Sequence, residues 1–320
     1  MAANPKVAQE IWASYIVEKL WKTNPHLNLC YDESEHVKGG SIVYIPQAGA
    51  KPNVVKNRTQ RPATAVQRND SAIFYPLDDY STDPTVITWA EGMEISYAKT
   101  DSVLSDHTNV LAETVGDEVL YSWVKGFKPT AGGGSTVEYL PVNRQLFTSG
   151  AAADVNAEDG QTGQRLAFNY KDLQKAQAKM NKDNVSKESR YAMVESNMLQ
   201  QLIDSLSSNQ MAAFQASADL KNGIIGRFAG FDILERSNVL AFDGTNKPII
   251  PGQALAGTDN LGVLCWQKDS VTKAVGDKEL FQRPNDPLYY GDLYSCIVKM
   301  GGRSRREDWK GVLSIVQKTA

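Results

Sequence analysis

The first apolar pattern in the chain is helical. Over residues 7–21 the large apolar side chains recur at i, i+4 spacing, as they do on one face of an amphipathic helix. These side chains are Ile11, Trp12, Tyr15, Ile16 and Leu20. We expect them to pack as an N-terminal arm. The polar, turn-like residues 26–40 that follow indicate a solvated tether rather than part of a domain.

Two short apolar runs then flank a long polar connection. SIVYI (41–45) and SAIFYPL (71–77) are rich in β-branched and aromatic residues, which is typical of strands. Between the runs lies the 24-residue stretch PQAGAKPNVVKNRTQRPATAVQRN (46–69), which contains three prolines and almost nothing that could fill a core. The pattern predicts a stretched hairpin. At ~3.3 Å per residue, its tip would stand roughly 40 Å from the body.

A longer helical pattern occupies residues 101–125. Its apolar stripe consists of Leu104, His107, Leu111, Val115, Val119 and Trp123. Thr100 is suited to cap the start and Gly126 to end the helix, so the span is about 25 residues, or ~37 Å. Gly116 lies inside this span and costs about 1 kcal/mol relative to alanine, which argues against an unbroken rod.

The rest of the chain mixes helical and strand patterns. Residues 127–165 read as loop with short strands, and residues 239–290 as mixed strand and loop. Between them we expect a helix at 169–184, a buried strand at 190–196, a helix at 197–206 and a strand at 231–235. Residues 293–317 read as two strands joined by a basic turn with Arg303, Arg305 and Arg306. The sequence therefore predicts an α+β fold.

Composition narrows the class of protein. The 320 residues are enough for more than one core, and 42% hydrophobic with 22% charged residues is ordinary for a folded chain. A net charge of −3 gives no overall attraction for nucleic acid. The three widely spaced cysteines do not form a disulfide framework. No apolar run is long enough for a membrane span, and we expect no signal peptide.

Few residues suggest catalysis. Ser105, Asp106 and His107 include the residue types of a catalytic triad, but consecutive helical residues point in different directions. His26, Cys30 and His36 could bind zinc, but they lack its paired spacing, so a solvated linker is preferred. We therefore expect no enzyme activity, metal or cofactor.

Opposite charges separate along the chain. Residues 46–69 contain five bases and no acid, whereas residues 100–124 contain five acids and no lysine or arginine. The bases are Lys51, Lys56, Arg58, Arg61 and Arg68, and the acids are Asp101, Asp106, Glu113, Asp117 and Glu118. A long loop with little apolar content cannot be ordered by its own packing, so we expect its bases to pair with the acids of a neighbouring copy. The alternative, in which both sets are only solvated, stays open.

In their order and spacing, these elements resemble the tailed-bacteriophage major capsid protein of the Hong Kong 97 fold. The arm (10–21), the hairpin (41–89) and the long helix (101–125) carry the resemblance, together with residues 172–203 and 222–238. The resemblance implies four parts. They are an N-terminal arm (1–40), an extended β-hairpin loop (41–92), a peripheral domain (93–184 and 291–320) with the spine helix, and an axial domain (185–290).

The resemblance also implies a function. Copies of the chain would form hexamers and pentamers of an icosahedral shell around double-stranded DNA, with the loop and arm on neighbouring subunits. Portal, scaffolding and decoration proteins would be partners, and assembly would take place in the bacterial cytoplasm. Two other classes stay open: the shell of an encapsulin-like cellular compartment, and a metal-dependent hydrolase that uses His26, Cys30 and His36.

Overall fold

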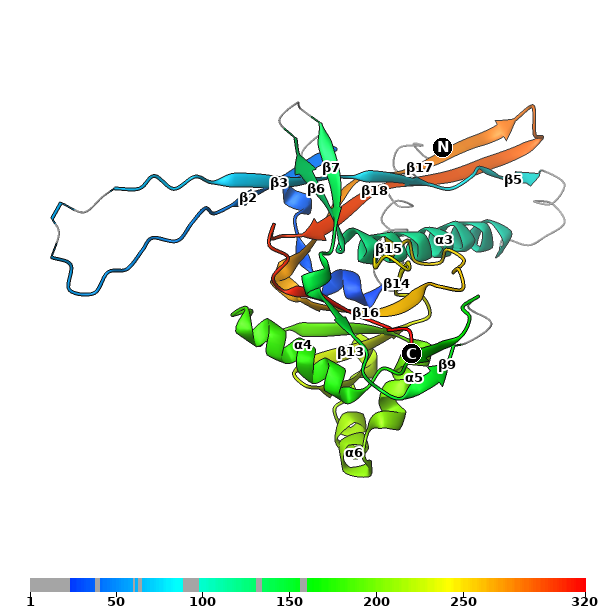
Figure 1. Ribbon diagram of the computed structural model, residues 1–320. Coiled ribbons are helices and arrows are strands. Elements are labelled where there is room, and N and C mark those ends of the chain that lie inside the picture. Colours follow the sequence, from blue (N-terminus) through cyan, green and yellow to red (C-terminus); the bar gives the residue numbers. More distant parts are fainter. Residues whose placement is uncertain are drawn as a thin grey trace.

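The computed structural model describes residues 24–37, 41–59, 61–62, 65–88, 98–130, 134–155 and 160–320, with the side chains of 98–102 left aside. The expected arm helix at 7–21, with Ile11, Trp12, Tyr15, Ile16 and Leu20, lies outside these residues. The described part is α+β, as predicted, and Figure 1 shows two main sheets, one above the other, with a long loop that projects to one side.

The first sheet is built on a long antiparallel hairpin. Its strand order is β1 (Tyr31–Asp32), β17 (Val271–Asp286), β18 (Gly291–Ser304) and β4 (Asp78–Ser81), with β5 (Thr85–Thr88) also paired to β18. Helix α3 (Ala98–Ser122) packs along β18 (Figure 1). The predicted domain boundary at residues 290–291 falls between β17 and β18, so it divides a single hairpin.

The second sheet forms the other half of the body. Its order is β12 (Ile224–Phe228), β13 (Phe231–Arg236), β11 (Arg190–Glu195), β16 (Asn260–Gln267), β14 (Leu240–Phe242) and β15 (Pro248–Ile249). β19 (Val312–Val316) pairs with β16 and with β8 (Gln145–Phe147). The accompanying helices are α4 (Tyr170–Lys182), α5 (Ser196–Ser205) and α6 (Ser208–Ala216). The predicted elements at 169–184, 190–196, 197–206 and 231–235 are confirmed, whereas α6 was not predicted.

Smaller elements complete the fold. β2 (Ile42–Gln47) and β3 (Ser71–Pro76) pair antiparallel, which confirms the stretched hairpin. β3 also pairs with β6 (Lys125–Pro129), and β6 pairs with β7 (Ser135–Tyr139). β9 (Ala152–Asp154) pairs with β10 (Gln164–Leu166). The short 3-10 helices are η1 (Pro25–Asn28), η2 (Ser34–His36), η3 (Val142–Arg144), η5 (Leu220–Asn222) and η6 (Lys268–Ser270).

The expected solvated tether is wrong. Residues 24–37, which we call the N-terminal strap, are packed between the two sheets, and Leu27 and Cys30 belong to the main core. Trp266 Nε1 donates to Leu29 O at 2.9 Å, and Asn24 Nδ2 donates to Ala112 O at 2.6 Å. The polar side chains of the strap look solvent-exposed in sequence because their partners lie far away along the chain.

Gly116 does not break helix α3, contrary to the expectation. A Cβ atom at this position would lie 2.1 Å from Asn24 Oδ1, so glycine allows the strap to approach the helix backbone. His26 Nε2 lies 3.2 Å from Gly116 O. The low helix propensity of glycine is thus offset by packing against the strap. The helix ends at Ser122, and Lys125 and Gly126 lie in β6.

We predict that Gly116→Ala destabilises the protein, although alanine is the better helix former by about 1 kcal/mol. The added methyl group must displace Asn24, so the thermal unfolding temperature of the purified subunit should fall. The same substitution in an Asn24→Ala background should cost less, because the closest clash is gone and only the flexible Arg236 Nη2, at 2.8 Å, remains in the way. Thr114→Ala, on the exposed side of α3, is the matched control and should change little. A stabilising Gly116→Ala would contradict this packing.

We also predict that stability falls in mild acid because of His26. Burial, aided by the charge of Arg236, lowers the pKa of His26 to about 3. The unfolded chain, with an ordinary imidazole pKa of ~6.5, therefore binds the extra proton first. The free energy of unfolding is therefore highest above pH 6.5 and decreases as the pH falls towards 3. At pH 5 the decrease is roughly 2 kcal/mol.

Urea unfolding of the subunit between pH 7 and pH 5 measures this loss. His26→Gln should flatten the decline, whereas exposed His36→Gln should leave it in place. Burial also lowers the pKa of His107, so some decline should persist in both variants. An unchanged slope in His26→Gln would contradict the assignment.

Candidate intersubunit surfaces

The described residues of the extended loop, 48–59, 61–62 and 65–70, project from the body and are almost entirely exposed. Only Gly49 among them is half-buried, and Val54 and Val66 are 90% and 87% exposed. Contacts occur only at its base, where Gly49 N donates to Asp70 Oδ1 at 2.8 Å. Figure 1 shows both arms of the loop running away from β2 and β3. The loop is thus a surface without a partner in the subunit.

The five loop bases differ in their surroundings. Among the described residues, Lys51, Lys56, Arg58 and Arg61 form no ion pair. Arg68 is held by its own chain, because its Nε lies 2.6 Å from Asp70 Oδ1. Four of the five loop bases therefore have no ion-pair partner in the part of the chain that the structure describes.

The acids of α3 do not form one exposed face. Asp106 and Glu113 are exposed and Glu118 is half-buried, whereas Asp117 is only 8% exposed. Arg236 Nη2 lies 2.9 Å from Asp117 Oδ1, so Asp117 is engaged inside the subunit. Burial raises the pKa of Asp117, and Arg236 opposes that rise. Asp101 belongs to the helix, but its side chain lies outside the described set. Of the five acids expected to meet a neighbouring copy, Asp117 is therefore already engaged by the subunit itself.

The two strands predicted within 293–317 are present as β18 and β19, and Arg305 and Arg306 lie in the connection between them, but the predicted hairpin pairing and the place of Arg303 are wrong. β18 and β19 belong to different sheets, and Arg303 is buried at the end of β18. Arg303 Nη1 donates to Phe74 O at 2.6 Å and to Phe127 O at 3.0 Å, and burial lowers its pKa to about 10. Arg305 pairs with Glu33, and Arg306 pairs with Asp308. These arginines join segments of the subunit.

The candidate metal ligands are separated and occupied. His26 contacts the backbone of α3, Cys30 Sγ donates to Leu27 O at 3.0 Å, and His36 is exposed. Among the described residues, no group of three or more His, Cys, Asp or Glu side chains could hold a metal ion. A hydrolase built on His26, Cys30 and His36 therefore has no support in this geometry.

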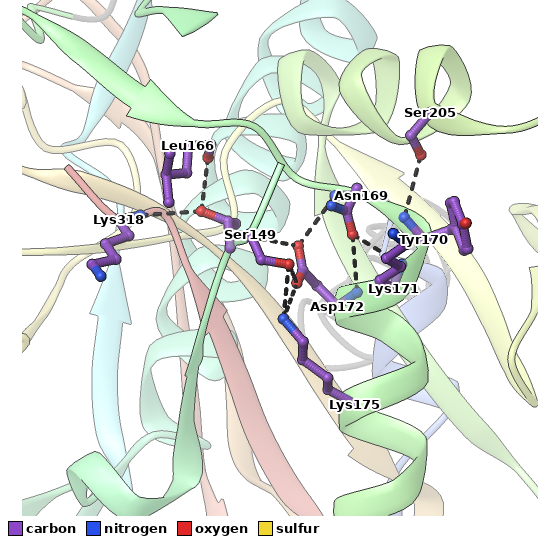
Figure 2. A network of polar contacts seen from close by, with 10 residues as sticks. Ser149, Leu166, Asn169, Tyr170, Lys171, Asp172, Lys175, Ser205 and Lys318 are labelled. Atoms are coloured by element: carbon purple, nitrogen blue, oxygen red, sulfur yellow. Dashed lines mark hydrogen bonds and ion pairs between the residues drawn. The ribbon is translucent and has the colours of Figure 1, made fainter. Parts of the chain in front are cut away.

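One polar cluster resembles a nucleophile with its base (Figure 2). Lys175 Nζ lies 2.8 Å from Ser149 Oγ, but it also lies 2.9 Å from Asp172 Oδ1. Asp172 is buried and forms the capping box of α4 with Asn169. Because the Lys175 ammonium is paired with this carboxylate, it has no lone pair to accept the Ser149 proton. The cluster anchors the loop at Ser149 to the start of α4.

Sequence reasoning missed an exposed apolar hairpin tip. At the turn between β17 and β18, Leu288 and Tyr290 are 77% and 79% exposed, and Tyr289 lies between them. The signal was the run Leu288-Tyr289-Tyr290 after two prolines, an unusual composition for a solvated turn. The tip is a second surface that the subunit itself leaves uncovered.

No described helix is long and apolar enough to cross a membrane. The chain also matches no protein-family model and no curated protein sequence. Solved structures do match it over most of its length, and phage structures and a virus-like particle are among them.

The structure from Mycobacterium phage Che8 is 15% identical, covers 90% of this chain and 89% of its own, and has a TM-score of 0.56. The capsid of Ralstonia phage GP4 is 13% identical, with 91% and 87% covered and a TM-score of 0.58. The virus-like particle from Pyrococcus furiosus is 10% identical, with 96% and 99% covered and a TM-score of 0.51. The chain therefore has the Hong Kong 97 fold of phage capsids, which confirms the fold expected from the sequence.

We predict that the extended loop contributes little to the stability of the isolated subunit. Replacing residues 52–67 by a short glycine linker keeps the contact between Gly49 and Asp70 and should shift the unfolding temperature by less than ~2 °C. Leu27→Ala, which opens a cavity in the main core, is the positive control and should cost ~2–5 kcal/mol. A loss of many degrees in the loop variant would show that the loop packs on its own body.

Proposed function

We propose that this chain is the major capsid protein of a tailed bacteriophage. The observation that carries the proposal is the extended loop, which exposes valines and four unpaired bases on a subunit with the fold of phage capsids. An ordered loop needs contacts to offset its lost conformational entropy, and a closed array of copies supplies them. We assign the chain a structural role and no catalytic one.

The proposal extends to the assembly. Hexamers and pentamers would tile an icosahedral shell around double-stranded DNA, with weak and non-specific DNA contacts that suit a net charge of −3. The N-terminal arm, through Ile11, Trp12, Tyr15, Ile16 and Leu20, would pack on a neighbour. Portal, scaffolding and decoration proteins would be partners in the cytoplasm of the bacterial host.

A division into domains follows the sheets. We assign α3 and the β17–β18 sheet to a peripheral domain and the sheet centred on β11 and β16 to an axial domain. This keeps the two-domain arrangement expected from the sequence but places β17 with its partner strand. The extended loop and the N-terminal arm remain separate contact elements.

The shell of a cellular compartment is the second candidate. The match to the virus-like particle from Pyrococcus furiosus, which covers 96% of this chain and 99% of its own, favours keeping it. Nucleic acid in particles purified from the natural source would support the phage capsid. A protein cargo without nucleic acid would support the compartment.

We predict that reversing Lys51, Lys56, Arg58, Arg61 and Arg68 to glutamate leaves a folded subunit that assembles poorly. The reversed loop would meet the acids of the next copy with like charge, which steers subunits apart. Electron microscopy and sedimentation should show few particles, while circular dichroism stays unchanged. Replacing the exposed acid Glu188 by lysine is the control for a single charge change elsewhere. Normal shells from the five-base variant would refute the pairing.

A further inference from the structure

A cavity of about 590 Å³ opens between α3 and the segment that carries β4 and β5. Three carboxylates line it: Asp79 and Asp83 from the strand segment and Asp106 from the helix. Asp79 already has a cation nearby, because Lys299 Nζ lies 3.5 Å from its Oδ1. Asp83 and Asp106 form no ion pair with any described residue.

A buried and unpartnered histidine lies in the same cavity. His107 is 7% exposed, and its Nε2 has no hydrogen-bond partner among the described residues. Burial lowers the pKa of His107, so the ring is neutral at pH 7. In the tautomer with the proton on Nδ1, Nε2 offers a lone pair. His107 Nε2 and the carboxylates of the cavity are therefore all acceptors, which suit a cationic hydrogen-bond donor.

The donor is an organic cation rather than a metal ion. Asp79, Asp83, Asp106 and His107 do not converge into a group that could hold a metal. The cavity also has an apolar side, lined by Val103, Val110 and Leu111. Such a wall suits the methylene stem of a lysine or arginine, whose charged head would then reach the carboxylates.

The extended loop gathers several such cations on one projecting segment. Lys51, Lys56, Arg58 and Arg61 are exposed and unpaired among the described residues, and Val54 beside them is exposed as well. In Figure 1 the loop leaves the body on the side opposite to β5 and the start of α3, so it points away from its own cavity. A loop can therefore enter this cavity only from another molecule.

We propose that the cavity lined by Asp83, Asp106 and His107 receives a basic side chain from the extended loop of a second copy. The inference rests on the proposed function, because it names the surface by which neighbouring subunits recognise each other. The proposed docking site is thus a local cavity rather than the row of acids along helix α3. It includes Asp79 and Asp83, which lie outside the helix.

A synthetic peptide of residues 48–69 tests the proposal directly. The receptor is the full chain with its own five loop bases changed to glutamate, so that its own loop cannot compete, and fluorescence anisotropy reports binding. Adding Asp83→Lys and Asp106→Lys to the receptor should weaken binding at least about tenfold, because two attractions become repulsions. A peptide with glutamine at its five bases should not bind.

Glu113→Lys is the matched control, because Glu113 is an exposed acid of the same helix but does not line the cavity. It should change peptide binding less than about threefold. Equal weakening by Glu113→Lys, or undiminished binding to the Asp83→Lys/Asp106→Lys receptor, would overturn the cavity as the docking site. The proposed shell function would survive either result.

Particle formation separates the two proposals. Asp83→Lys with Asp106→Lys in the otherwise unchanged chain should reduce particle yield, and adding Arg58→Glu and Arg61→Glu should restore part of it. Peptide binding to the cavity without particles from the unchanged chain would refute the shell function but support the docking site. Particles that are indifferent to the cavity charges would refute the docking site alone.

Discussion

The body depends on the contact that joins its two sheets at Trp123 and Trp266. Trp123 follows α3 and donates from Nε1 to Thr272 O of β17 at 2.9 Å. Its ring centroid lies 5.2 Å from that of Trp266 in β16, the central strand of the other sheet. Both rings are fully buried, so a large part of the apolar surface that stabilises the fold is concentrated where helix, strap and both sheets meet. The N-terminal strap completes this junction through Leu29.

The extended loop is therefore independent of what stabilises the subunit. Ordering one residue costs about 1–2 kcal/mol of backbone entropy, and the loop gains no burial in return within its own chain. The same holds for the tip at Leu288 and Tyr290. In Figure 1 the loop and the turn between β17 and β18 lie at opposite extremities of the molecule. A subunit with a complete core and uncovered extremities is suited to assembly without remodelling its body.

The sequence predicted elements with a strong period and missed those set by distant contacts. The hairpin of β2 and β3, α3 and β11 were predictable because their apolar residues alternate or recur every turn. The strap was not, because Asn24 and His26 are polar and become buried only against α3. The same limit applies to the candidate site. The sequence shows Asp117 as one of the acids of the helix, but only the structure shows that Asp117 forms an ion pair with Arg236 inside the subunit. The cavity at His107 required the strand segment at Asp83 to fold beside the helix.

Buried charges and the exposed charges of the extended loop differ in whether they have partners within the subunit. The buried ones, such as Arg303, Asp117 with Arg236, and Glu33 with Arg305, have partners within the subunit, because an unpaired charge in a core is strongly unfavourable. Four bases of the extended loop are instead exposed and have no ion-pair partner among the described residues. Exposed pairs are weak and screened by salt, so a wrongly placed neighbour can leave before other contacts form. In the proposed shell, many such contacts would add up to a stable particle, and the weakness of each pair would allow errors to be corrected during assembly.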